Sequence, residues 1–230
     1  MTTLTSPRFA ELLAVLHQDA ERSDRDHVAE MMAAIEAPGA SIDTVVADLL
    51  AQERADYPAT YRARAGNFLA VSADYGRFLY AMARACAARR IVEFGTSMGI
   101  STLYLAAALR DNGGGTLIGS EMEPAKVARA EDHLARAGLS DLAEIRTGDA
   151  LETLRDVGGT VDLLLIDGAF SLYLPVLKLV EPHLRPGSVV VAENAFDPDY
   201  RNHVRDSRNG YVSLALPDSR RGNDFAVRLA

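Results

Sequence analysis

The chain has two parts that differ in the spacing of their apolar residues. Up to about residue 75, apolar positions recur every three or four residues, which is the period of an amphipathic helix. Three runs have this spacing, and they predict three helices, over residues 9–16, 28–35 and 42–49. Pro38 and Gly39 separate the second run from the third, and Ser41 is placed to be an N-cap. No strand pattern precedes residue 90.

After residue 90, short runs of β-forming residues alternate with helical segments. The runs are RIVEFG, TLIGSE, AEIRTGD, VDLLLIDG and SVVVAEN, and the helices lie near 101–110, 124–137, 150–156 and 171–184. This alternation predicts an α/β fold with a parallel sheet. VDLLLI is apolar almost throughout, which is typical of a central strand covered on both faces. The last two runs, YVSLAL and FAVRLA, predict an antiparallel hairpin at the sheet edge.

Composition and charge narrow the class of protein. At 230 residues, 48% apolar and 24% charged, the chain is typical of a soluble globular protein with its own core. It has neither an apolar stretch of membrane-spanning length nor a secretory signal pattern, so we expect a cytoplasmic protein with no membrane partner. The net charge of -8 opposes a nucleic-acid partner, and the basic pairs Arg89-Arg90 and Arg220-Arg221 are too short to form a binding patch. The single cysteine, Cys86, has no partner within the chain and is interpreted as a small apolar residue.

The turn after the first predicted strand is the strongest candidate site. IVEFGTSMGIS places a strand that ends at Gly95, a tight turn through Thr96, and a helix beginning near Ser101. In sheets of this kind, ligands bind beyond the carboxyl ends of the strands, where helix N-terminal N–H groups receive an anionic group. A carboxylate or a phosphate would suit such a turn equally well. Glycine needed for the turn geometry alone remains an alternative.

The next acidic residue favours one ligand. Glu121 closes the second strand, where a carboxylate accepts hydrogen bonds from both ribose hydroxyls. Glycines at 95 and 99, preceded by Glu93, do not form the G-x-G-x-x-G pattern of dinucleotide sites. S-adenosylmethionine is therefore favoured over NAD. Glu93 would then face the ammonium group of this cofactor, and the helix N-terminus near Ser101 would face its carboxylate.

Three later strands end in oxygen-bearing side chains. Asp149 is placed to accept a hydrogen bond from an adenine amine or, alternatively, to cap the next helix. Asp167 stands at the mouth of the central strand, where burial without a partner would be costly. Together with Glu193 and Asn194 it offers three oxygen donors, which suit Mg²⁺. Alternatively, Glu193 and Asn194 only shape the strand end.

Taken in order, these motifs resemble the cation-dependent O-methyltransferases, the S-adenosylmethionine-dependent family that includes catechol and caffeoyl-CoA O-methyltransferases. The resemblance covers about residues 66–230, through AVSADYGRFLY, VEFGTSMGIS, GSEMEP, TGDALETL, DLLLIDGAFSLY and LRPGSVVVAEN. It implies a Rossmann-like methyltransferase fold, with a seven-stranded, mostly parallel sheet, helices on both faces and an N-terminal helical extension. We accordingly divide the chain into a cap or dimerisation segment, 1–75, and a cofactor-binding domain, 76–230. A homodimer is part of what the resemblance implies.

The resemblance also implies roles for single residues. The amino-acid end of the cofactor would contact Glu93, Gly95, Thr96 and Ser101, and its ribose would contact Glu121. Its adenine would contact Met122, Asp149 and Ala150, and Val71 and Ser72 would cover the cofactor. Asp167 would lie beside the reacting atoms. The family's metal ligands correspond to Asp167, Glu193 and Asn194, and the cation lowers the pKa of the attacking hydroxyl of an aromatic diol.

The catalytic half departs from the family pattern. The family has a lysine, acting as general base, three residues after the aspartate of the fourth strand, and this chain has Phe170 there. Its Asp-Asn metal pair is Glu193-Asn194 here. The remaining candidates for removing a proton are His203 and Tyr173, which are alternatively a solvated loop histidine and a helix packing residue. The other histidines, at positions 17, 27, 133 and 183, are assigned no role.

We therefore expect an enzyme that uses S-adenosylmethionine to methylate a hydroxyl of a small acceptor, such as an aromatic metabolite. Phe170 keeps open a second interpretation, a protein that binds the cofactor but has metal-independent or non-methylating chemistry. A third interpretation, an NAD-dependent oxidoreductase, is disfavoured by the missing glycine.

Overall fold

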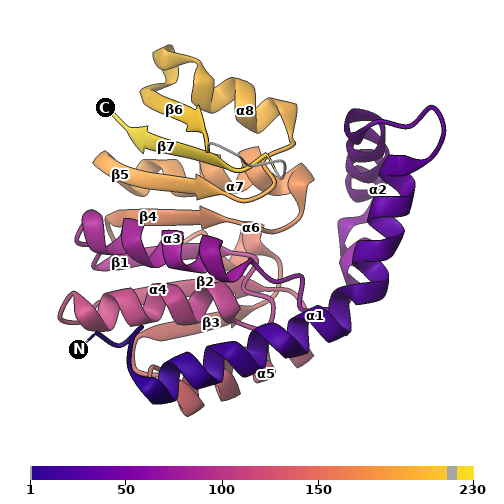
Figure 1. The fold of residues 1–230 in the computed structure, drawn as a ribbon. Helices are drawn as coiled ribbons and strands as arrows, with labels where there is room; N and C mark the ends of the chain where they lie inside the picture. The colour runs from indigo at the N-terminus through magenta and orange to yellow at the C-terminus, as the bar shows by residue number, and fades with distance from the viewer. Residues whose placement is uncertain (1, 217–221) are drawn as a thin grey trace.

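Seven strands form one sheet, with helices on both of its faces (Figure 1). The computed structural model describes residues 2–216 and 222–230. The strands lie in the order β3-β2-β1-β4-β5-β7-β6. Their bounds are β1 Arg90–Phe94, β2 Thr116–Glu121, β3 Ala143–Thr147, β4 Val161–Ile166, β5 Leu184–Ala192, β6 Tyr211–Ala215 and β7 Asp224–Arg228. The strands β1 to β5 are parallel and β7 and β6 are antiparallel, so the predicted α/β sheet and its edge hairpin are confirmed.

The helices agree with the prediction after residue 90, with one addition. Their bounds are α1 Pro7–Glu36, α2 Ile42–Arg62, α3 Ala73–Ala85, α4 Ile100–Asp111, α5 Pro124–Ala137, α6 Ala150–Thr153, α7 Tyr173–Val180 and α8 Pro198–Arg205. The added helix is α8, in a stretch interpreted above as a loop. Asp197 caps it by accepting hydrogen bonds from the N–H groups of Asp199 and Tyr200, and Pro198 occupies its first turn.

The core lies on both sides of the central strand β4, whose six residues are all buried. Successive side chains of a strand point to opposite faces. Leu163 and Leu165 join the apolar cluster that includes residues of α1, α3 and α4. Leu164 and Ile166 join the cluster formed with α6, α7 and α8. The apolar run VDLLLI therefore marks a strand covered on both faces, as predicted.

The N-terminal segment differs from the prediction. The first two predicted helices form one continuous helix, α1, because no breaker separates them before Pro38. The first half of α1 packs into the core, whereas the second half and the start of α2 stand away from the sheet (Figure 1). Val28, Met32 and Ile42 on these parts are 54%, 49% and 42% exposed. The division of the chain at residues 75 and 76 stays a prediction, and this boundary falls inside α3.

The helix α2 is kinked, and the kink directs its last turn toward the sheet. Asp56 leaves the helical conformation two residues before Pro58, which has no N–H group to donate within the helix. Beyond the kink, Tyr57 and Tyr61 make hydrogen bonds to loops at the carboxyl ends of the strands. The N-terminal segment is therefore part of the structure around the strand ends.

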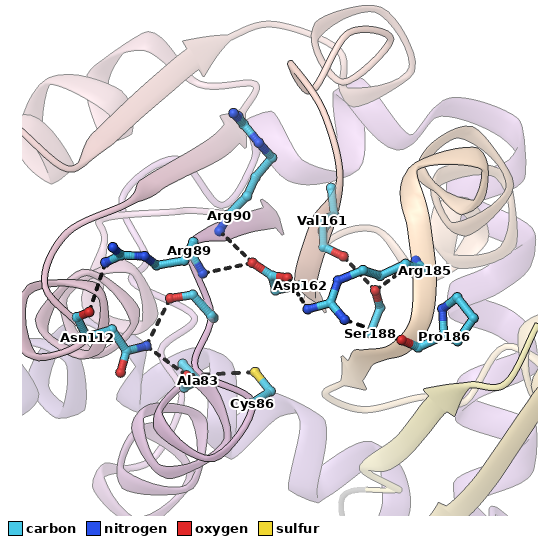
Figure 2. A network of polar contacts seen from close by, with 11 residues as sticks. Ala83, Cys86, Arg89, Arg90, Asn112, Val161, Asp162, Arg185, Pro186 and Ser188 are labelled. Atoms are coloured by element: carbon cyan, nitrogen blue, oxygen red, sulfur yellow. Dashed lines mark hydrogen bonds and ion pairs between the residues drawn. The ribbon is translucent and has the colours of Figure 1, made fainter.

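A polar network closes the opposite, amino-terminal end of the sheet (Figure 2). The Asp162 carboxylate accepts hydrogen bonds from the backbone N–H groups of Arg89 and Arg90, at 2.8 and 3.0 Å, and from the Arg185 guanidinium, at 2.8 Å. Burial acts to raise the pKa of Asp162, but these donors outweigh it and hold that pKa below its usual range. The network joins β1, β4 and β5, so this end of the sheet is structural.

Within the described residues, no helix is long and apolar enough to span a membrane. The predicted surface pair Arg220 and Arg221 lies outside those residues.

Candidate active site

The turn between β1 and α4 needs glycine for its geometry. Gly95 has a φ of +91°, and a Cβ atom there would lie 2.1 Å from the carbonyl oxygen of Asp167. The backbone of the turn thus packs directly against the backbone of the loop after β4. Gly99, with a φ of +84°, directly precedes α4. Geometry accounts for both glycines, and it leaves the first N–H groups of α4 at the strand ends, where an anion can bind.

Glu93 is completely buried beneath this turn. Its carboxylate accepts hydrogen bonds from the hydroxyls of Thr96, Ser101 and Thr102, at 2.9, 2.6 and 2.6 Å. Burial raises the pKa of Glu93, and the three hydroxyls offset this only in part. A carboxylate accepts about four hydrogen bonds, so there is capacity for one cationic group. Thr102 was not singled out from the sequence, although it follows Ser101 directly.

A pocket opens at the carboxyl end of β1. Five of the expected cofactor residues line it, namely Val71, Gly95, Thr96, Ser101 and Asp167. The lining also contains four residues that the sequence analysis did not anticipate, namely Phe68, Leu69, Ala70 and Ile100. Ser72 is not part of it, because this exposed residue caps α3 by accepting a hydrogen bond from the N–H of Tyr75 at 3.2 Å.

Glu121, the residue expected to hold the ribose, lies beside the same turn. Its carboxylate accepts hydrogen bonds from the N–H groups of Ser97 and Glu123, both at 2.8 Å. Ser97 has a φ of +47° and lies two residues after Gly95. Met122 follows at the end of β2 and is half-buried. The structure thus brings the ribose candidate to the turn through a backbone hydrogen bond.

Asp149 has two partners, one of them unexpected. One of its oxygens accepts the N–H of Leu151 at 2.9 Å, so the interpretation as an N-cap of α6 is confirmed. The other accepts the hydroxyl of Tyr57 at 2.5 Å, a hydrogen bond that raises the pKa of Tyr57 to about 12. Ala150 is buried next to it. The place expected for adenine is therefore in contact with α2.

Asp167 and Glu193 directly follow two neighbouring strands. Ile166 and Ala192 are paired in the sheet, so the residues after them share its carboxyl edge. Burial raises the pKa of Tyr75, and the charges of Glu193 and Asp167 raise it further.

The metal prediction rests on a limited donor set. In the part of the chain that the structure describes, no three His, Cys, Asp or Glu side chains are grouped to hold a metal ion. A site here would consist of Asp167 and Glu193 with the amide of Asn194, whose backbone has a φ of +50°. Two carboxylates and an amide are hard oxygen donors, so these residues suit Mg²⁺ in kind.

Neither candidate for proton removal, Tyr173 or His203, lines the pocket. Tyr173 is fully buried, and its hydroxyl donates a hydrogen bond to the carbonyl oxygen of Glu193 at 2.6 Å. Burial raises its pKa well above the usual range, so it acts as a packing residue that fixes the end of β5. His203 lies in α8, and its Nε2 is 3.1 Å from Glu181, just before the start of β5. It therefore faces the amino end of the sheet, away from the pocket.

Aromatic rings cover the loops after β4 and β5. Phe170 packs edge to face against Tyr173 and Phe196, with ring centroids 5.6 and 6.0 Å apart. Tyr173 packs against Tyr200 in the same way at 5.8 Å. Phe170 and Phe196 are partly exposed. The position that holds a lysine in the resembled family thus belongs to an aromatic surface.

Two more residues of α2 reach these loops. Glu53 is fully buried, and its carboxylate accepts the Tyr61 hydroxyl at 2.9 Å and the N–H of Ser171 at 2.7 Å. The Tyr61 hydroxyl lies 3.4 Å from the carbonyl oxygen of Gly168. The sequence analysis assigned neither residue a role, because a carboxylate on an amphipathic helix is usually solvated.

Comparisons with known proteins agree with this geometry. A family profile described as a methyltransferase domain matches residues 92–195. A catechol O-methyltransferase of Niastella koreensis is 35% identical over 161 residues, which cover 67% of this chain and 72% of the relative. Among solved structures, the O-methyltransferase TomG from Streptomyces achromogenes, in complex with S-adenosylmethionine, has a TM-score of 0.65 at 27% identity, covering 74% of this chain and 86% of TomG. The cofactor-bound Rv0187 from MTB has a TM-score of 0.65 at 26% identity, covering 90% of this chain and 96% of that one.

These matches favour the methyltransferase interpretation over the non-methylating and NAD-dependent alternatives. The profile match spans the turn at Gly95 and the carboxylates at the ends of β2, β4 and β5. The chain belongs to the S-adenosylmethionine-dependent O-methyltransferase family that includes the catechol and caffeoyl-CoA O-methyltransferases.

Proposed function

We propose that this chain transfers the methyl group of S-adenosylmethionine to a hydroxyl of a small aromatic acceptor. The observation that carries the proposal is the position of Asp167, which lines the pocket at the end of β1 and lies three residues before Phe170, whose ring packs on Tyr173 at the start of α7. Cofactor and acceptor sites would then adjoin at one carboxylate. The names of relatives, catechol and caffeoyl-CoA O-methyltransferase, support an aromatic acceptor.

In the proposed mechanism, the chain holds and aligns two substrates and forms no covalent bond to either. Glu93 pairs with the cofactor ammonium, the first N–H groups of α4 receive its carboxylate, and Glu121 accepts hydrogen bonds from its ribose. S-adenosylmethionine supplies an electrophilic methyl group on a sulfonium centre. Phe170 and Phe196 hold the acceptor ring so that its oxygen points at that methyl group, and they exclude water from the reacting atoms.

We propose that Asp167, Glu193 and Asn194 hold a divalent cation such as Mg²⁺. Their hard oxygen donors at the ends of adjacent strands support this assignment. A bound cation would act as a Lewis acid that lowers the pKa of the acceptor hydroxyl.

Calorimetric titration with S-adenosylhomocysteine, in chelator and in excess Mg²⁺, tests the proposal first. We expect binding in both conditions, because the residues assigned to the cofactor are distinct from Glu193 and Asn194. A panel of catechols and phenols is then assayed with methyl-labelled S-adenosylmethionine, with and without Mg²⁺. Cofactor binding without transfer to any acceptor of the panel would refute the proposed reaction, and transfer that chelator does not affect would refute the metal assignment.

We further propose that the chain forms a homodimer through the second half of α1 and the start of α2. The exposed apolar side chains of Val28, Met32 and Ile42 support this, because such a surface is stabilised when a partner covers it. Light scattering that gives the mass of a single chain would contradict it. A cytosolic location is also proposed, in keeping with the single free thiol at Cys86, and cell fractionation tests it.

A further inference from the structure

The helix α2 brings a buried carboxylate to the loop that carries Phe170. Glu53 is 0% exposed, and one of its oxygens is fixed by the N–H of Ser171, the residue next to Phe170. Burying a carboxylate is costly unless it is well paired. Its partners are one backbone N–H and one phenol, neither of which is a cation. Each oxygen of the Glu53 carboxylate accepts one of these hydrogen bonds, which leaves lone pairs that can take up a proton.

The hydrogen bonds of Tyr61 leave its oxygen able to accept a proton. A phenol has one hydrogen to donate and two lone pairs. The hydrogen goes to Glu53 at 2.9 Å, since a carboxylate is a stronger acceptor than the carbonyl of Gly168 at 3.4 Å. The lone pairs of the Tyr61 oxygen can then accept a hydrogen bond from an incoming hydroxyl.

The hydroxyl of Tyr61 lies close to the proposed reaction centre. Burial raises its pKa well above the usual range, the charges of Glu53 and Asp167 add to this, and Arg64 opposes it. Gly168, whose carbonyl oxygen lies 3.4 Å from the Tyr61 hydroxyl, directly follows Asp167, which lines the cofactor pocket. Tyr61 thus remains protonated and can pass a proton on without becoming a free phenolate.

We propose that Tyr61 and Glu53 form the proton-accepting pair of the methyl transfer. Tyr61 is the catalytic residue that touches the acceptor hydroxyl, and Glu53 is the group that takes up the proton. The inference rests on the proposed function, and it assigns to the N-terminal helix α2 the task that Phe170 cannot perform.

The transfer balances in atoms and charge. The acceptor oxygen forms a bond to the methyl carbon, and the bond from that carbon to sulfur breaks, giving a neutral thioether. The acceptor proton moves to the oxygen of Tyr61 as the phenol proton moves to Glu53. The positive charge lost at sulfur and the negative charge lost at Glu53 cancel, so no further reactant is needed.

The variants Glu53→Gln and Tyr61→Phe test the pair, with Tyr80→Phe as the matched control. Tyr80 also donates to a carboxylate, Asp111, at 2.7 Å, at the far end of α4 from the site. With catechol as acceptor, we expect both test variants to lose about 100-fold or more in kcat, within the range of general base catalysis. Their affinity for S-adenosylhomocysteine should equal that of the wild type, and the control should keep full activity.

A second acceptor distinguishes the loss of a general base from the loss of a structural contact as the cause of a lower kcat. 4-Nitrocatechol is acidic enough to be largely ionised at the assay pH, so its methylation needs no base, and the defect of both variants should largely disappear. An equal defect with both acceptors, or unchanged kcat of Tyr61→Phe with catechol, would overturn the inference. If Glu53→Gln does not fold, judged by its S-adenosylhomocysteine binding, Tyr61→Phe decides alone. A wild-type chain that binds the cofactor but methylates no acceptor of the catechol and phenol panel would instead refute the proposed function and the inference with it.

Discussion

The replacement Glu93→Gln separates the cofactor role of this residue from its role in the fold. It keeps the shape of the side chain and removes its charge. The amide oxygen can still accept hydroxyl donors, and the Ser101 hydroxyl can turn to accept from the amide nitrogen. What is lost is a hydrogen bond between charged groups, worth about 1.5–3 kcal/mol. Because about 1.4 kcal/mol corresponds to a factor of ten, binding of S-adenosylhomocysteine should weaken roughly 10- to 150-fold.

The same variant should change how stability depends on pH. Burial raises the pKa of Glu93, so the folded state keeps its proton at a higher pH than the unfolded chain does. Stability from this group is complete below the ordinary value of 4.5 and is lost as the pH rises through the folded value. Glutamine has no such transition. Between pH 4.5 and neutrality, the Tm of Glu93→Gln should therefore fall less than that of the wild type.

Two ligands make the assay specific. S-adenosylhomocysteine carries the amino-acid group, whereas 5′-methylthioadenosine lacks it and keeps the ribose and adenine. Calorimetry should show that Glu93→Gln weakens the first ligand and leaves the affinity for the second unchanged. Equal loss for both ligands would show that Glu93 acts by supporting the turn, and the assignment to the ammonium group would be wrong.

Three further substitutions test the turn at Gly95 and the two candidates for proton removal. Gly95→Ala must place a Cβ atom against the carbonyl of Asp167 at a positive φ. We therefore expect the free energy of unfolding, measured by thermal unfolding, to fall by at least about 2 kcal/mol, and cofactor binding to be lost. Normal binding would contradict the close approach. Tyr173→Phe removes a buried hydrogen bond to a backbone carbonyl, which should cost about 1 kcal/mol in denaturant unfolding with turnover largely kept; a loss of turnover above about 100-fold would restore Tyr173 as a base. His203→Ala removes the contact with Glu181 and should lower stability by at least about 1 kcal/mol without changing kcat/KM, and a defect in kcat/KM would support His203 as a base.

The fold was predictable because its signals are local. Each strand from β1 to β5 is a short β-forming run, and the turn at Gly95 combines glycines with a preceding carboxylate. The same reasoning predicts that Glu121 and Asp167 lie at the carboxyl edge of the sheet, since parallel strands end together. The helix α8 was missed although its cap, Asp197 followed by proline, is a start signal in the sequence.

The residues from α2 could not be predicted in this way. Glu53 bonds to Ser171, 118 residues away, and Tyr57 bonds to Asp149, 92 residues away. Neither pair leaves a periodic pattern, because the contact depends on how a kinked helix docks onto loops formed much later in the chain. The position of His203 could not be predicted for the same reason, since its contact with Glu181 is set by the direction in which α8 presents it.

The long helix α1 connects the wall of the pocket with the exposed apolar surface formed by Val28 and Met32. At 30 residues it is about 45 Å long, and its middle is held where Asp24 accepts the N–H of Phe68 at 2.7 Å. His27 is also held, by Arg64, so the part of α1 from His27 to its end at Glu36 is about 14 Å long, and a rotation of about 10° would move its end by about 2 Å. Phe68 also lines the cofactor pocket. Phe68 therefore connects the pocket wall to α1, and a displacement of that wall would be transmitted to the part of α1 that exposes Val28 and Met32.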